Sequence, residues 1–218
     1  MKIVIQCAAR KNPDAGMMKN KDGTPVLFVA RPDRAPPTTN HVYAHPDERA
    51  EEGQSWRDQL LDYNARPNGN PLGLFPAWRL YRHEVYGKLI ERYGLDNVFI
   101  LSAGWGLIRS DFLTPVYDIT FSGQAEEYKR RRPRDPYRDL TMLEAQADEP
   151  VAFFGGKDYL PLYCRLTETT PGRRIAVFNS KIEPQHAGIR FVRYHTSTRT
   201  NWHYEAVNAF LEGAFFSA

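Results

Sequence analysis

The sequence predicts an α/β protein with a mostly parallel sheet flanked by helices. Several short apolar segments, rich in β-branched and aromatic residues and without polar alternation, are typical of strands covered on both faces. Segments with helical spacing lie between and after them, which favours parallel strands joined by crossover helices. No internal repeat is visible, so a solenoid is not expected. We therefore expect residues 1–218 to form a single domain, with an irregular insertion at about residues 12–75 after the first strand.

The strands expected in this sheet are residues 2–7, 98–101, 151–154, 174–178 and 190–194. Within the insertion, where Pro, Asn, Asp and Gly are scattered, only two segments have regular patterns. Residues 26–30 are typical of a short strand, and residues 56–63 have weak helical spacing.

Helical spacing is clearest in residues 75–94, which begin near a proline and end at Gly94. The apolar stripe of this expected helix consists of Trp78, Tyr81, Val85, Leu89 and Tyr93. Residues 156–170 and 201–216 are the other expected helices, and Asn201 is a candidate N-cap.

Composition excludes several classes of protein. The chain has 42% hydrophobic and 25% charged residues, as ordinary globular proteins do, and lacks the run of about 18 apolar residues that a membrane helix needs. The first apolar run alternates and is followed by no cleavage site, so it predicts a strand and not a signal peptide. Cys7 and Cys164 lie too far apart for a zinc ribbon and suggest a reduced compartment. We therefore expect a cytoplasmic protein.

The carboxyl ends of parallel strands are where α/β proteins bind ligands. Small residues and cations follow the expected strands, in particular Arg10, Lys11, Gly155, Gly156 and Lys157. Residues 179–181 and 195–197 follow the last two strands. Backbone amides with nearby cations are typical of a phosphate site. The alternative is that the glycines only form turns, and neither a Walker A sequence nor a dinucleotide-binding fingerprint is present.

The stretch "SAGWG", residues 102–106, ends the second strand in a tight turn. Trp105 lies between two glycines there, so its ring is a candidate platform for a base, unless it folds onto the domain. Asp111 and Asp118 are candidate catalytic carboxylates because a carboxylate near a sugar can stabilise an oxocarbenium-like centre. Either could instead form a cap or an Asx-turn. The substrate-binding candidates in this region are Ser102, Trp105, Gly106 and Tyr117, with Tyr159 at a later helix entry.

A basic stretch, residues 128–139, reads "YKRRRPRDPYRD". Its cations and interleaved tyrosines suit backbone phosphates and exposed bases, although the net charge of the whole chain is only +3. The nucleic-acid-binding candidates are Lys129, Arg130, Arg131, Arg132 and Arg134. The alternative is a solvated loop whose cations pair with neighbouring carboxylates.

No resident cofactor and no metal site are predicted, because the histidines show no spacing typical of metal ligands. Cys7 has no base beside it in the sequence, so we interpret it as a small buried hydrophobe.

Residues 102–118 resemble a segment of the YaaA-type peroxide-stress proteins and of shorter YaaA-like domains from bacteria and phages. The matching positions are Ser102, Trp105, Gly106, Leu107, Asp111, Pro115 and Tyr117, and the surroundings of Lys11 and Tyr159 are also similar. The resemblance implies an α/β fold with a positively charged cleft and an association with DNA or its protection under oxidative stress. Asp118 is similar to the shorter domains, some of which lie near nucleobase-modifying genes, and this implies a small nucleotide substrate as an alternative to DNA.

The sequence therefore leads to three hypotheses. The first is a protein that binds a nucleotide or an exposed base of single-stranded DNA in its strand-end cleft and acts on an N-glycosidic bond. In it, Arg10, Lys11 and Lys157 hold phosphate, Trp105 stacks, and Asp111 or Asp118 supplies the carboxylate. The second is a non-catalytic DNA-binding stress protein that uses residues 128–138, and the third is an α/β interaction module.

Overall fold

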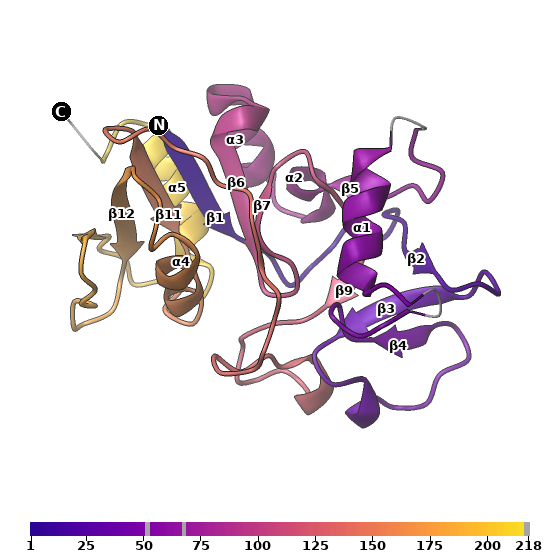
Figure 1. Ribbon diagram of the computed structural model, residues 1–218. Coiled ribbons are helices and arrows are strands. Elements are labelled where there is room, and N and C mark those ends of the chain that lie inside the picture. Colours follow the sequence, from indigo (N-terminus) through magenta and orange to yellow (C-terminus); the bar gives the residue numbers. More distant parts are fainter. Residues whose placement is uncertain (51–52, 67–68, 216–218) are drawn as a thin grey trace.

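The computed structural model describes residues 1–50, 53–66 and 69–215. Its main sheet has seven strands in the order β10-β7-β6-β1-β11-β12-β13. Figure 1 labels β7, β6, β1, β11 and β12 of this sheet. These strands are β1 (Lys2–Gln6), β6 (Val98–Ser102), β7 (Gly106–Arg109), β10 (Leu140–Thr141), β11 (Pro150–Phe154), β12 (Arg173–Phe178) and β13 (Ile189–Arg193). The α/β class is confirmed.

All five predicted strands of the main sheet are present and lie parallel to one another. β1 is central, with Ile3 paired to Val98 of β6 and to Ala152 of β11. β7 was not predicted; it folds back antiparallel to β6 through a tight turn, and β10 adds to its outer edge. The segment that we interpreted as a loop after residue 102 thus supplies a further strand of the sheet.

Helices cover both faces of this sheet. Successive side chains of a strand point to opposite faces, and β11 shows which helix covers which face. Phe153 stacks on Tyr163 of α4 (Leu160–Leu166), with ring centroids 4.5 Å apart, whereas Phe154 contacts Phe210 of α5 (Trp202–Leu211) at 5.1 Å. α3 (Glu84–Tyr93) packs beside α5. The three helices therefore enclose the apolar central strands.

The predicted helix of residues 75–94 is divided into α2 (Ala77–Leu80) and α3. Between them the chain is extended, because its backbone bonds to the segment that follows β1: Asn12 N donates to Leu80 O and Arg82 N to Arg10 O. His83 then starts α3 by accepting the amide of Val85 on its ring nitrogen. The tertiary pairing outweighs the local helical preference of these residues.

The insertion contains more regular structure than its sequence predicted. Beside α1 (Trp56–Ala65) it forms a small sheet from β2 (Met18–Lys19), β3 (Pro25–Val29) and β4 (Val42–Ala44), to which β9 (Tyr117–Asp118) is added. β5 (Phe75–Pro76) pairs with β8 (Leu113–Thr114), and short 3₁₀ turns occupy Pro32–Arg34, Leu95–Asn97 and Glu127–Lys129. Figure 1 shows β2, β3, β4 and β9 gathered beside one edge of the main sheet.

One continuous cluster of buried side chains joins the insertion to the main sheet. Phe28 of β3 and Trp56 of α1 belong to it together with Ile3 and Ile100 of the central strands. Among the described residues, no helix is long and apolar enough to cross a membrane.

Gly106 is the first residue of β7, and its surroundings explain why the last position of the "SAGWG" stretch requires glycine. Its φ is +92°, and a Cβ atom would lie 2.5 Å from the carbonyl oxygen of Leu140 and 2.6 Å from its nitrogen. The backbone of β10 therefore passes directly over this position. The tight turn of residues 102–106 therefore lies against another strand of the same chain, β10.

We predict that Gly106→Ala destabilises the protein much more than Gly23→Ala. Gly23 also has a positive φ of +79°, but no atom lies within 4 Å of a Cβ there, so only backbone strain of about 1–2 kcal/mol is expected. At Gly106 the clash with backbone adds a further ~1–3 kcal/mol. Denaturant unfolding of both variants measures the difference. Equal losses in the two variants would contradict the close approach of β10.

Candidate functional site

The order of the strands defines where a ligand site is expected. From β1 the chain passes to β6 on one side of the sheet, whereas β11, β12 and β13 extend on the other side. Crossovers that leave in opposite directions open a crevice at the carboxyl ends of the two strands where the order reverses, here β1 and β11.

A cleft of about 810 Å³ lies at this edge of the sheet. Its walls are the segments that follow β1, β11, β12 and β13, together with Thr120 and Ser122 and the first turn of α5. Residues 7–9, 155–159, 179–181 and 196–204 supply most of the lining. A volume of this order is typical of small-molecule sites. The sequence prediction of a strand-end cleft therefore agrees with the geometry.

Positive charge dominates the cleft. Its lining contains the cations Lys157, Lys181, Arg193 and Arg199 and one carboxylate, that of Asp158. None of these four cations forms an ion pair with a carboxylate of the described residues. Unpaired cations on the wall of a cleft attract anions from solution.

The Gly155-Gly156 turn lines the cleft, as predicted, but its glycines also serve the fold. Gly156 N donates to the side-chain oxygen of Gln6 at 2.6 Å. A Cβ on Gly155 would lie 2.3 Å from the ring of Phe153, so this position requires glycine for packing. The helix that follows, α4, has only seven residues. The amide of Gly156 and the space beside Gly155 are therefore occupied by contacts within the protein.

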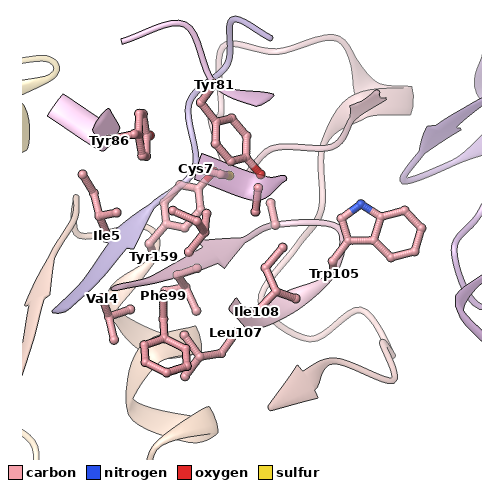
Figure 2. Close-up of a cluster of buried hydrophobic side chains, with 14 of the residues drawn as sticks. Val4, Ile5, Cys7, Tyr81, Tyr86, Phe99, Trp105, Leu107, Ile108 and Tyr159 are labelled. Atoms are coloured by element: carbon pink, nitrogen blue, oxygen red, sulfur yellow. The ribbon is translucent and has the colours of Figure 1, made fainter. Parts of the chain in front are cut away.

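Tyr159 and Cys7 form the inner wall of the cleft. The Cys7 thiol and the Tyr159 hydroxyl are 3.2 Å apart, and both residues line the cleft although their side chains are mostly buried. Figure 2 shows Cys7, Tyr81 and Tyr159 close together at the end of β1. Burial raises the pKa of Tyr159 well above its ordinary value, so its hydroxyl is a neutral hydrogen-bonding group.

Next to this wall lies a polar cluster formed by the buried residues Tyr81, Ser102 and Tyr117 and by the half-buried Lys11. Ser102 donates to the Tyr117 hydroxyl at 2.9 Å, Tyr81 and Tyr117 share a second bond of 2.9 Å, and the Lys11 ammonium lies 4.3 Å from the Tyr117 ring. Burial lowers the pKa of Lys11, an effect that the nearby Cys7 and Asp118 oppose. We expected from the sequence that Lys11, Ser102, Trp105, Asp118 and Tyr159 converge on one site, but of these five only Tyr159 lines the cleft.

Ser102 and Tyr117 are completely buried and do not line the cleft, so the prediction that they contact substrate is wrong for this structure. The hydroxyl of Ser102 accepts the amides of Gly104 and Trp105, at 3.2 and 3.1 Å. The amides of the turn that we expected to face a ligand are therefore satisfied within the chain.

Trp105 is likewise fully buried, and its predicted role as a stacking platform is corrected here. Its ring meets Phe28 edge to face at 5.1 Å and Tyr117 at 6.4 Å, and Figure 2 shows it within the buried cluster. A ring enclosed on all sides offers no face to a base. Trp105 belongs to the core between the insertion and the sheet.

Two buried arginines hold the turn that contains Trp105. Arg57 of α1, which is 1% exposed, donates to Gly104 O and Trp105 O at 3.0 and 3.1 Å and pairs with Asp47. Arg131 donates to Ala103 O at 2.8 Å and forms a two-pronged ion pair with Asp139. We call this arrangement the arginine clamp: Arg57 and Arg131 bound to the carbonyls of residues 103–105.

Arg131 therefore cannot contact nucleic acid as predicted, because its side chain is 2% exposed and is bound to Asp139 and to Ala103 O. Lys129 is also paired, with Asp118 at 2.9 Å and Glu126 at 3.0 Å. Arg130 bonds weakly to Gly123 O, whereas Arg132 and Arg134 are exposed on the surface. The basic stretch thus presents only part of its charge to solvent.

The candidate carboxylates do not lie in the cleft. Asp111 pairs with Arg109 beside Asp96, and Ser110 N bonds to Val98 O, so Asp111 lies at the amino end of β6, away from the cleft. Asp118 lies beside Lys11 and Lys129 but is not part of the lining. Arg10 is exposed and also outside the lining, whereas Lys157 is within it.

Sequence reasoning missed the cations Arg193 and Arg199 and the first turn of α5. The signal available was the polar run "HTSTRTN", residues 195–201, between the last strand and the last helix. Such a run leaves few apolar side chains to cover the strand ends. The sheet order that places β13, and the run that follows it, on the same side of β1 as β11 could not be obtained from one sequence.

No family model matches the chain, and no curated protein matches it.

We predict that Arg131→Met destabilises the protein by about 3–5 kcal/mol, because it leaves the Asp139 carboxylate and the Ala103 carbonyl buried with fewer partners. The matched control Arg134→Met, in the same stretch but exposed, should change stability by less than about 0.5 kcal/mol. Denaturant unfolding distinguishes the two. Similar stabilities for both variants would show that the clamp does not hold the turn.

Proposed function

We propose that this protein binds a nucleotide in the cleft at the carboxyl ends of β1, β11, β12 and β13. One observation carries the proposal: the lining of this cleft has four cations and one carboxylate, at the position where the strand order reverses. The cations favour an anionic ligand, and the location is the one where α/β sheets hold small molecules.

The cleft has more room than a phosphate group alone requires. Its volume of about 810 Å³ and its aromatic wall residues, Tyr159, Phe178 and Trp202, suit a sugar and a base beside the charged groups. Polar side chains from residues 196–200 add hydrogen-bonding partners for hydroxyl groups. A nucleoside phosphate uses all of these features, whereas inorganic phosphate uses the cations alone.

Cleavage of an N-glycosidic bond stays a prediction. Asp111 and Asp118, the two candidate carboxylates for that step, both lie outside the cleft lining and are bound to Arg109 and Lys129. The alternative of DNA binding by residues 128–138 rests on fewer free cations than the sequence suggested, because Arg131 and Lys129 are paired. The proposal therefore rests on the cleft and is limited to ligand binding.

The proposal predicts that nucleoside 5′-monophosphates bind to the protein and that a bulky side chain in the cleft prevents it. Ala9 is exposed and lines the cleft, so Ala9→Trp should fold normally and reduce affinity at least about tenfold by occupying the ligand's space. Thr169→Trp, also on an exposed position but outside the lining, is the matched control. Isothermal titration of both variants and the unmodified protein measures the affinities.

Binding that is unaffected by Ala9→Trp would place the ligand elsewhere on the molecule. If the unmodified protein binds none of the adenosine, guanosine, cytidine and uridine 5′-monophosphates, the proposal itself is overturned. In the expected case, affinity should also fall as salt concentration rises, because exposed cations contribute to it.

A further inference from the structure

The charge of the cleft changes along the edge of the sheet. The strand order β1-β11-β12-β13 places residues that follow β1 at one end of the cleft and residues that follow β13 at the other. At the β1 end the described lining consists of residues 6–9, Tyr159, Thr120 and Ser122, with no cation and no carboxylate among them. The Tyr159 hydroxyl joins this group, because it contacts both the Cys7 thiol and Thr120. The β1 end is therefore uncharged.

Positive charge is concentrated at the β13 end instead. After β11, Lys157 is followed directly by Asp158, and both are exposed and line the cleft, so their charges compensate each other. The segments after β12 and β13 contribute Lys181, Arg193 and Arg199, and no carboxylate belongs to this part of the described lining. Three cations without a compensating charge therefore lie at one end of the cleft.

These three cations differ from the arginines that hold the fold together. Arg57 and Arg131 are buried and each binds an aspartate, and even Arg138, whose side chain is 62% exposed, binds Asp58. The cations at the β13 end form no ion pair within the described parts of the chain. Their charge therefore remains available for an anion from solution.

The loop that carries Arg199 has a defined shape. Glu205 of α5 accepts the hydroxyls of Thr196 and Thr198 at 2.8 and 2.5 Å, and these bonds lower the pKa of its carboxyl. The loop ends at Asn201, which is the N-cap residue of α5 as predicted, although its side chain makes no capping bond. Glu205 itself is not part of the cleft lining. Its carboxylate thus fixes the loop without neutralising the cleft.

The amount of charge indicates which anion fits. A phosphate monoester carries a charge of about −1.5 to −2 near pH 7, less than three cations can balance. A chain of two or three phosphates carries more. Arg193 is the last residue of β13, and Lys181 follows β12. Neighbouring strands lie about 5 Å apart, so their cations suit successive phosphate groups of one chain.

The same end of the cleft offers little to a magnesium ion. Proteins that bind a nucleotide together with Mg²⁺ usually hold the ion through one or two carboxylates and the phosphates. Asp158 supplies the one carboxylate in the described lining, and it lies beside Lys157 after β11. Across the described residues, no group of three or more His, Cys, Asp or Glu side chains is placed to hold a metal ion. Protein cations are therefore the groups that can neutralise the phosphates.

We infer that the ligand is a nucleoside di- or triphosphate whose phosphate chain is bound directly by Lys181, Arg193 and Arg199 at the β13 end, without Mg²⁺; this inference rests on the proposed function. The base then lies at the uncharged β1 end. The phosphates are thus bound at the opposite end of the cleft from Arg10 and Lys11, to which the sequence assigned them.

Titration calorimetry with the nucleosides adenosine, guanosine, cytidine and uridine and their 5′-mono-, di- and triphosphates tests this inference. For the base that binds best, the diphosphate should bind the unmodified protein at least about tenfold more tightly than the monophosphate, because a second phosphate meets further cations. Excess Mg²⁺ should weaken binding of the di- and triphosphate at least about threefold, because it occupies phosphate oxygens and cancels their charge.

A double variant locates the phosphate chain. Lys181→Gln combined with Arg193→Gln should weaken diphosphate binding at least about tenfold and change nucleoside binding less than about threefold. Arg190→Gln is the matched control, since Arg190 is also exposed on β13 but does not line the cleft. It should leave both affinities unchanged. Thermal unfolding should give the same midpoint for all three proteins, because the replaced side chains are exposed.

Equal affinity for mono-, di- and triphosphates would overturn the inference and leave the proposed function intact. A double variant that binds the diphosphate normally, or that loses nucleoside and diphosphate affinity to the same extent, would also overturn it. So would di- or triphosphate binding that Mg²⁺ strengthens. If the unmodified protein bound none of the nucleosides or nucleotides, the inference and the proposed function would both be wrong.

Discussion

The arginine clamp is the interaction on which the rest of the arrangement depends. The turn of residues 103–105 presents three consecutive carbonyls inside the molecule, where an unsatisfied polar group is strongly unfavourable. Arg57 from the insertion and Arg131 from the basic stretch satisfy them. Each guanidinium is in turn neutralised by an aspartate, Asp47 or Asp139. A buried cation with both a carboxylate and carbonyl partners is stable, whereas one without them is not.

The clamp also explains why the cleft is open on one side of β1 only. It fixes the insertion and residues 117–131 over the carboxyl end of β6, where Trp105 and Tyr117 fill the remaining space. The carboxyl ends of β11, β12 and β13 receive no such cover and are bordered by polar loops instead. The position of the cleft thus depends on the segments that cover the β6 half of the sheet edge as well as on the loops that line the other half.

The sequence was sufficient to predict the central strands, because a strand buried on both faces has an apolar run that needs no knowledge of its neighbours. It was not sufficient where a residue's role depends on distant partners. Trp105 and Arg131 have the local sequence of exposed binding residues, yet α1 and Asp139 enclose them. Asp111 follows a strand that turned out to be antiparallel, and so it lies at the opposite end of the sheet. Each of these three differences arises from tertiary contacts between segments far apart in the chain.

Asp118 illustrates why a binding role is better supported than a catalytic one. Its carboxylate contacts Lys129 and lies near Lys11, two cations that compensate its charge. Burial opposes the charge of Lys129, but hydrogen bonds to Asp118 and Glu126 outweigh this effect and raise its pKa. A carboxylate that acts on a sugar has to reach the reacting carbon, whereas Asp118 is directed toward these ammonium groups and lies outside the lining. Burial and, to a smaller extent, Lys129 lower the pKa of Lys11 and Asp118 opposes that effect, so the charge of Asp118 offsets the repulsion between these two cations.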